Sequence, residues 1–216
     1  VYEHRVVNMQ LSGFTYWFLL FLAEDFSYYV MHYVDHKCRF FWAVHVTHHS
    51  SLYFNLTTGF RSPVLQPLYR GFYYVPLAWL GFPPADIMVM YAATQVYGSL
   101  VHTERVKSLG FLEWFMVTPS HHRVHHSSNP KYLDKNMGMA LIIWDRLFGT
   151  FAKEDPAEPC RYGLTKPIED RGPVNIVFHE WRDMAHDLKT KARTFKDKLG
   201  FIFGPPGWQP KSDKSA

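Results

Sequence analysis

The first long apolar run of the chain covers residues 11–31, LSGFTYWFLLFLAEDFSYYVM. Its first half carries no charged side chain, and its length would allow a helix of about twenty residues to cross a bilayer. Glu24 and Asp25 follow, and charged side chains at bilayer depth usually face a protein interior or serve a function. Because the run leads into His32, we interpret it as a helix that rises from lipid toward a polar site. The alternative is a buried helix of a soluble protein with both acids facing solvent.

A second apolar stretch covers residues 72–101, where Asp86 is the one charged side chain. Gly81-Phe82-Pro83-Pro84 divides it into two parts, and neither part is long enough to cross a bilayer comfortably. We therefore predict re-entrant or interfacial segments, or a helical hairpin. Glycines and prolines between the two apolar regions, in residues 50–72, argue against a long continuous helix there.

The rest of the chain carries shorter helical signals. Thr118-Pro119-Ser120 predicts a helix start, because proline is favoured in the first turn and hydroxyl side chains are favoured as caps. Residues 142–151 predict an amphipathic interfacial helix that ends at Gly149, with core packing as the alternative. Residues 179–200 predict a soluble helix with a basic end. We expect a membrane catalytic domain at residues 1–170 and a basic C-terminal helix and tail at residues 171–216.

Composition narrows the class of protein. Aromatic side chains make up 18% of the 216 residues, which suits interfacial belts and lipid contact. The net charge is +4, but the basic residues form no single patch, and we expect no nucleic-acid partner. Cys38 and Cys160 are far apart, which favours a reducing, cytoplasmic setting for the site. The chain begins with Val1 and without a signal peptide, and we expect transmembrane helices upstream of it.

Histidine is concentrated in two short stretches. The chain has 13 histidines. Five lie in the first stretch: His32, His36, His45, His48 and His49. The first two are four residues apart, so on a helix their rings leave the same face, and the last three also have helical spacing. On one straight helix, however, the two sets would face opposite sides. We therefore predict a break or turn at residues 37–39 that lets both sets serve one site.

A second stretch repeats this spacing in the sequence HHRVHH, with His122, His125 and His126. His102 ends the second apolar region much as His32 ends the first, which favours a role as a ligand, and His121 is a tenth candidate. Four histidines suffice for one tetrahedral metal ion, so nine predict two ions. Five nearby side chains are candidates to orient the rings through hydrogen bonds: Glu24, Asp25, Glu104, Asp134 and Asn136.

These motifs together carry a resemblance to a known family. They are HxxxH at residues 32–36, HTE at 102–104, HxxHH at 45–49 and 122–126, NLTTGFR at 55–61, and DKNMGMALIIWDRLFGTF at 134–151. The chain resembles the fatty acid hydroxylase and sterol desaturase superfamily, and within it the alkylglycerol monooxygenase-like members, over roughly residues 12–170. The motifs are specific to the superfamily and much less specific to a substrate.

The resemblance implies an all-α fold, an integral membrane helical bundle with a cytosolic histidine-rich cap that holds two iron ions on the cytoplasmic side. It implies O2-dependent hydroxylation or desaturation of a lipid such as a sterol, a fatty acyl chain or an alkylglycerol. The nine histidines would be the iron ligands. Related enzymes have a second histidine shortly after the position of His102, where this chain has Val106, so the site has one ligand fewer or recruits His121.

The resemblance also implies an external electron donor, either a protein or a reduced pterin. The close group often has an acid after the second histidine, where this chain has Lys37, so a tetrahydropterin requirement does not carry over directly. Two rival functions are compatible with clustered histidines. A membrane-embedded zinc hydrolase would need fewer ligands, an open position and a carboxylate base. A non-catalytic metal-binding membrane protein would not need histidines on ordered helical faces.

Overall fold

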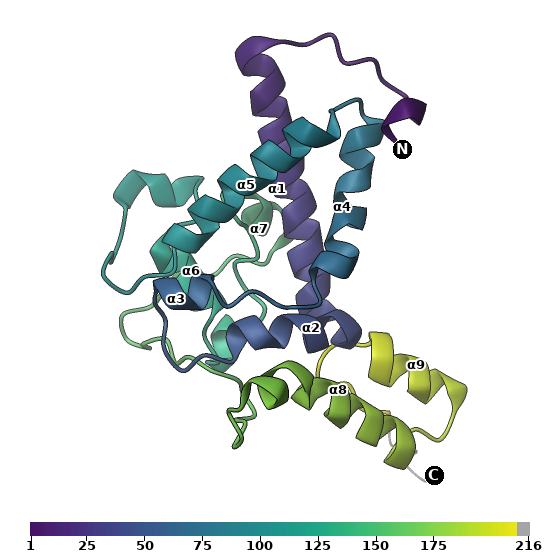
Figure 1. Cartoon of the computed structure of the whole chain (residues 1–216). Coiled ribbons are helices and arrows are strands. Elements are labelled where there is room, and N and C mark those ends of the chain that lie inside the picture. The colour runs from purple at the N-terminus through teal and green to yellow at the C-terminus, as the bar shows by residue number, and fades with distance from the viewer. Residues whose placement is uncertain (211–216) are drawn as a thin grey trace.

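The computed structural model describes residues 1–210 and has an all-α fold (Figure 1). Residues 211–216, the end of the predicted tail, lie outside this range. In chain order the α-helices are α1 (Gly13–Lys37), α2 (Arg39–His49), α3 (Leu56–Gly59), α4 (Pro67–Trp79), α5 (Pro84–Leu100), α6 (Pro119–His125), α7 (Ile143–Phe148), α8 (Pro173–Thr190) and α9 (Phe195–Phe203). Short 3-10 helices are η1 (Tyr2–His4), η2 (Gly110–Trp114) and η3 (Pro130–Tyr132).

The predicted break between the first two histidine sets is confirmed. α1 ends at Lys37, the backbone of Cys38 is extended, and α2 begins at Arg39. In a continuous helix the Arg39 N–H would bond to the carbonyl four residues earlier. Here it donates instead to the carbonyl of Gly204, 2.9 Å away, so a contact with the distant C-terminal segment accompanies the break.

The C-terminal segment packs against α2, and the prediction of a single helix over residues 179–200 is wrong. α8 ends at Thr190, and α9 begins after Thr194. The Thr194 hydroxyl accepts the Asp197 N–H at 3.1 Å, and the Asp197 carboxylate accepts the Thr194 N–H at 2.9 Å. This reciprocal capping starts a new helix, so it separates α9 from α8.

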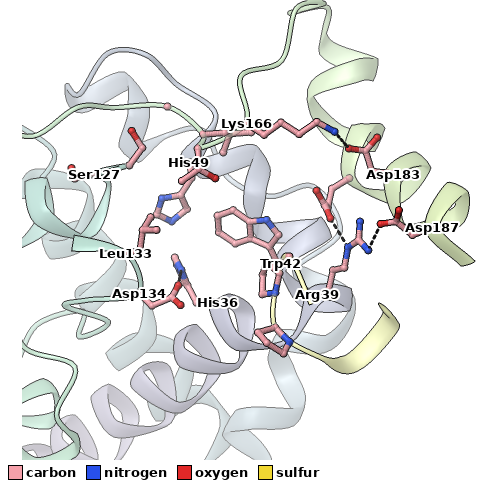
Figure 2. Close-up of a pocket in the computed structure, with 18 of the residues that line it drawn as sticks. His36, Arg39, Trp42, His49, Ser127, Leu133, Asp134, Lys166, Asp183 and Asp187 are labelled. Atoms are coloured by element: carbon pink, nitrogen blue, oxygen red, sulfur yellow. Dashed lines mark hydrogen bonds and ion pairs between the residues drawn. The ribbon is translucent and has the colours of Figure 1, made fainter. Parts of the chain in front are cut away.

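A buried arginine fastens α8 to α2. The Arg39 guanidinium donates to the carboxylates of Glu180 and Asp187, each at 2.7 Å (Figure 2). The Arg39 side chain is almost fully buried. Removing one member of such a group would leave a buried charge uncompensated, so this contact holds α8 in place beside the first histidines.

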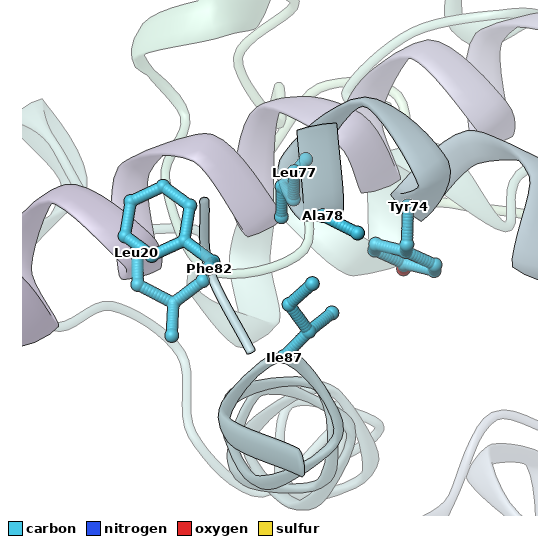
Figure 3. Packing of buried hydrophobic residues seen from close by; sticks show 6 residues of the cluster. All are labelled: Leu20, Tyr74, Leu77, Ala78, Phe82 and Ile87. Carbon is cyan, nitrogen blue, oxygen red and sulfur yellow. The ribbon is translucent and has the colours of Figure 1, made fainter. Parts of the chain in front are cut away.

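The predicted helical hairpin in the second apolar stretch is confirmed. α4 and α5 are joined by the Gly81-to-Pro83 turn, and both pack against α1 (Figure 1). A compact apolar cluster fills the space between them (Figure 3). Its residues are Leu20 of α1, Tyr74, Leu77 and Ala78 of α4, Phe82 of the turn, and Ile87 of α5. This core anchors the first half of α1.

α1 carries the predicted apolar run and continues beyond it. Glu24 and Asp25 are completely buried, so the alternative in which both acids face solvent is wrong. Within residues 1–210, no helix combines the length and the apolar character that a bilayer crossing requires.

The predicted start of one short helix and the predicted end of another are also confirmed. α6 begins at Pro119, directly after the cap residue Thr118. α7 covers Ile143–Phe148 and ends at Gly149, whose backbone is left-handed at φ +76°. A left-handed residue at this position favours glycine, because it has no Cβ.

Candidate metal centre

The break at Cys38 brings four histidines from two helices together. His32 and His36 come from α1, and His45 and His49 come from α2. The Nε2 atom of His45 lies 3.1 Å from that of His32 and 3.2 Å from that of His49. His125 of α6 joins them, with its ring centre 4.4 Å from that of His32. These five buried residues, His32, His36, His45, His49 and His125, are called the five-histidine group below.

The other four histidines form a second group beside the first. It consists of His48, His102, His122 and His126, and is called the four-histidine group. The Nε2 atom of His102 lies 2.9 Å from that of His122, 3.2 Å from that of His126 and 3.4 Å from that of His48. The rings of His49 and His126 stack 4.4 Å apart, so the two groups are in direct contact.

Neither HxxHH motif acts as a single unit. In α2, His45 and His49 point to the five-histidine group, whereas His48 points to the four-histidine group. At the end of α6 the division is reversed, because His125 belongs to the five-histidine group whereas His122 and His126 belong to the four-histidine group. Residues four apart share a helix face, and their neighbour is turned about 100° away. Each helix therefore passes between the groups and contributes to both.

Backbone carbonyls fix the orientation of four of the nine rings. The Nδ1 atom of His32 lies 2.8 Å from the carbonyl of Met137, and that of His125 lies 3.0 Å from the carbonyl of Lys135. In the other group, Nδ1 of His48 faces the carbonyl of Arg61 at 3.2 Å, and Nδ1 of His102 faces that of Gly98 at 2.8 Å. A carbonyl can only accept, so each of these rings carries its proton on Nδ1. Their Nε2 lone pairs are therefore free to bind a metal.

The histidines of this centre are neutral. Burial lowers the pKa of His48 to about 3 and that of His102 to about 4, because desolvation disfavours the imidazolium. The pKa values of His45, His122 and His125 also lie well below the usual value, and neighbouring imidazoles add to the effect of burial. Neutral imidazole is the form that binds metal ions.

Two carboxylates face Nδ1 atoms of the five-histidine group. Asp134 lies 3.4 Å from Nδ1 of His36, as expected for a residue proposed to orient a ring, and also pairs with Lys37. Burial acts to raise the pKa of Asp134, but hydrogen bonds from His36 and Lys37 outweigh it and lower the pKa. Asp35 lies 3.8 Å from Nδ1 of His45. Asp35 was not among the residues predicted from the sequence, although an acid inside the HxxDH motif was a visible signal.

Glu24 and Asp25 have other partners than histidine. Glu24 accepts a hydrogen bond from Thr94 at 3.2 Å. Asp25 accepts the backbone N–H groups of Ala140 and Leu141 and the indole N–H of Trp144. The expectation that these acids contact histidine N–H donors is therefore wrong. Both lie about two turns before His32, too far along α1 to reach its ring. Asp25 instead holds the loop whose Met137 carbonyl orients that ring.

Three further candidates also lie outside the two groups. The Nδ1 atom of His121 accepts the backbone N–H of Thr118 at 3.3 Å, which caps α6 and directs the ring away from both groups. Asn136 donates to the carbonyls of His121 and Ala152, so it links two loops and does not contact a ring. Glu104 is exposed. These positions are decided by local capping and loop contacts, which the spacing of histidines does not reveal.

A cavity of about 490 Å³ reaches the centre from the side of α8 (Figure 2). His36, His49, His125 and His126 form its inner end, and the acids of α8 line its outer wall. Trp42 lies between these parts, with its ring centre 5.2 Å from that of His36 and 5.5 Å from that of His49. The cavity gives polar molecules a route to both groups.

The two groups suit a pair of metal ions. Within each group the ligand nitrogens all lie within 4.8 Å of one another. The buried Nε2 atoms of His36 and His125 have no hydrogen-bond partner among the described residues. Buried polar atoms without partners are costly, and a metal ion would satisfy these lone pairs. Imidazole binds iron, zinc, copper and nickel, so the donor set allows iron without selecting it.

Comparison with known proteins identifies related chains. The family described as fatty acid hydroxylase matches residues 17–150. Alkylglycerol monooxygenase of Homo sapiens is 40% identical over 208 residues, covering 96% of this chain and 46% of that protein. The Xenopus tropicalis alkylglycerol monooxygenase is 39% identical over 208 residues, covering 96% of this chain and 46% of that protein. An ornithine lipid hydroxylase of Rhizobium tropici is 33% identical over 149 residues, covering 68% of this chain and 45% of that protein. The chain thus spans about half the length of these relatives. No solved structure matches it.

Proposed function

The chain belongs to the fatty acid hydroxylase family, and on this premise we propose that it is an O2-dependent di-iron oxygenase that hydroxylates or desaturates a C–H bond of a lipid. The observation that carries the proposal is the pair of adjacent histidine groups, with five and four neutral imidazoles. A zinc hydrolase would use fewer ligands, so this number of donors favours the oxygenase.

The residues of this chain would hold the metals and control access to them. The five-histidine group would hold one iron ion and the four-histidine group the other. Bound iron would supply the O2 activation and oxidising power that attack on an unactivated C–H bond requires. The protein keeps the imidazoles neutral by burial and fixes the tautomers of four of them through backbone carbonyls.

We propose a lipid substrate, with alkylglycerols as the first class to test. Relatives of this chain are named as an alkylglycerol monooxygenase, an ornithine lipid hydroxylase and a sterol desaturase, so different lipids are compatible with the same histidine pattern. The relatives with the highest identities among these are the alkylglycerol enzymes, which supports that choice.

We propose that the chain lies at a membrane, with the metal centre on the cytoplasmic side, and exposed apolar side chains support the membrane location. Large exposed apolar side chains lie where α1 begins and near the turn between α4 and α5, including Phe14, Trp79 and Met88. Apolar surface of this kind is typical of membrane contact. The centre lies at the opposite end of α1, about 27 Å away by helix rise from Phe14 to His32.

The electrons are proposed to come from outside the chain, through the cavity beside α8. Insertion of one oxygen atom of O2 consumes two electrons and two protons, and the other oxygen atom leaves as water. The cavity reaches both histidine groups from the polar side, and its Trp42 ring contacts two of the histidines. A reduced pterin or an electron-donor protein could deliver electrons there.

The test uses the full protein, purified in detergent from iron-replete cells. Iron per chain is measured, and a panel of alkylglycerol, fatty acyl and sterol substrates is incubated under 18O2 with a chemical reductant. We expect about two irons and an 18O-labelled or unsaturated product. His45→Ala and His122→Ala should both lower iron and abolish product, whereas His121→Gln, which keeps an acceptor for the α6 cap, should retain both. One zinc ion per chain without O2 consumption would contradict the proposal and favour the hydrolase.

A further inference from the structure

Asp35 is a buried carboxylate next to a histidine of the five-histidine group. Its exposed fraction is 0%, and it comes directly before His36 on α1. Its Oδ1 accepts the hydroxyl of Tyr69 at 2.7 Å, and its Oδ2 accepts the side-chain N–H of Gln66 at 2.8 Å. The same Oδ2 lies 3.8 Å from Nδ1 of His45. Three elements thus converge on this carboxylate: α1, α2 and the start of α4.

The Nδ1 atom of His45 differs from those of its neighbours. His32, His48, His102 and His125 each face a backbone carbonyl through Nδ1. His45 has no hydrogen-bond partner on Nδ1 among the described residues, although this atom is buried. The acid that faces it is Asp35, and a shift of about 1 Å would bring the two atoms to hydrogen-bond distance.

The contacts behind Asp35 fix which way its carboxylate points. Arg70 donates to the side-chain carbonyl of Gln66, so the amide N–H of Gln66 must face Asp35. Tyr69 holds the second oxygen from the adjacent turn of α4. Both donors to Asp35 are neutral groups, so neither forms an ion pair with the carboxylate.

We propose that Asp35 is a positioning residue for the metal centre: its carboxylate accepts the Nδ1–H of His45 and directs Nε2 of that ring to the metal. The inference rests on the two-metal site proposed above. With Asp134 facing His36, two imidazoles of the five-histidine group are backed by carboxylates. In the four-histidine group, His48 and His102 face neutral carbonyls. A carboxylate partner makes an imidazole more basic, so Asp35 strengthens metal binding at one group and not at the other.

The experiment measures Co²⁺ binding to the full protein after removal of its metals with a chelator. We expect two equivalents of Co²⁺ to bind, one at each histidine group. Asp35→Asn should weaken the binding of one equivalent roughly 10- to 100-fold and leave the binding of the other unchanged. Tyr69→Phe, which removes a donor to Asp35 without touching a histidine, should weaken the same equivalent by a smaller factor. Glu24→Gln is the matched control, because Glu24 is equally buried on the same helix but bonds to Thr94 of α5 and contacts neither a histidine nor the loop that orients His32. It should leave the binding of both Co²⁺ ions intact.

Equal weakening of both equivalents by Asp35→Asn, or no weakening of either, would overturn the inference. If Asp35→Asn does not fold, Tyr69→Phe decides the matter, and unchanged binding of both equivalents in that variant would overturn it as well. The proposed lipid oxidation is tested separately. Two Co²⁺ equivalents with a selective Asp35 effect, but no product from any lipid, would reject the oxygenase and retain Asp35 as a positioning residue.

Discussion

Adjacent histidines of one motif should have different effects on metal content. The perturbation starts from the double variant His45→Ala/His49→Ala, which removes two of the five ligands of the five-histidine group and none of the other. Three imidazoles then remain for one ion and four for the other. We expect the metal content to fall from about two ions per chain to about one, with the surviving ion in the four-histidine group.

A third substitution, added to this double variant, then distinguishes the role of His125 from that of His126. His125→Ala removes another ligand from the group that is already disabled, so the surviving ion should bind with unchanged affinity. His126→Ala reduces the intact group from four ligands to three. Loss of a residue that merely supports a ligand weakens metal binding 10- to 100-fold, so loss of a ligand should cost at least about tenfold, or about 1.4 kcal/mol.

The assay is elemental analysis of each purified variant, followed by Co²⁺ titration of the metal-free protein. Far-ultraviolet circular dichroism of each variant checks that the helices are retained. Equal effects of His125→Ala and His126→Ala on the surviving ion would refute the division of the motif between two groups. So would complete metal loss in the starting double variant, because the four-histidine group would then depend on His45 or His49.

Further expectations concern stability, pH and a close loop contact. Arg39→Ala leaves Glu180 without its buried cation and should lower the free energy of unfolding by about 3 kcal/mol, which corresponds to a fall of about 6–12 °C in unfolding temperature. The exposed ion pair of Lys166 and Asp183 should contribute less than about 1 kcal/mol to stability. Similar shifts in unfolding temperature for Arg39→Ala and Lys166→Ala would contradict this ranking. Because burial lowers the pKa values of His48 and His102 to about 3 and about 4, protons compete with metal only near those values. Co²⁺ affinity of the four-histidine group should therefore stay constant from pH 8 to about 5 and fall below that, whereas a fall centred near 6.5 would indicate ordinary imidazoles. Gly138→Ala would place a Cβ 2.4 Å from the Leu141 carbonyl, so it should lower both the unfolding temperature and metal binding by the five-histidine group, and thermal unfolding with metal analysis checks this.

Much of the fold was predictable because it follows from local signals. The break at residues 37–39 followed from the opposite helix faces of the two histidine sets, His32 and His36 against His45, His48 and His49. The α4–α5 hairpin followed from Gly81 and Pro83. The start of α6 followed from Thr118-Pro119. The division between α8 and α9 was missed, because the cap at Thr194 lies inside a stretch whose charge pattern fits one continuous helix.

The sequence by itself determined which histidines can act together, since a spacing of three or four residues fixes their positions on a helix. Only the tertiary structure decided that His48 and His125 belong to a different group from the other histidines of their motifs. The reason is that the packing of α1, α2 and α6 sets which rings lie together. It also decided that carbonyls such as that of Met137 orient the rings and that Asp35 faces His45. Every residue has a backbone carbonyl, so no pattern of residue types reveals which one approaches a ring. The partners of buried polar atoms depend on contacts between segments as far as 148 residues apart, and long-range packing alone brings those segments together.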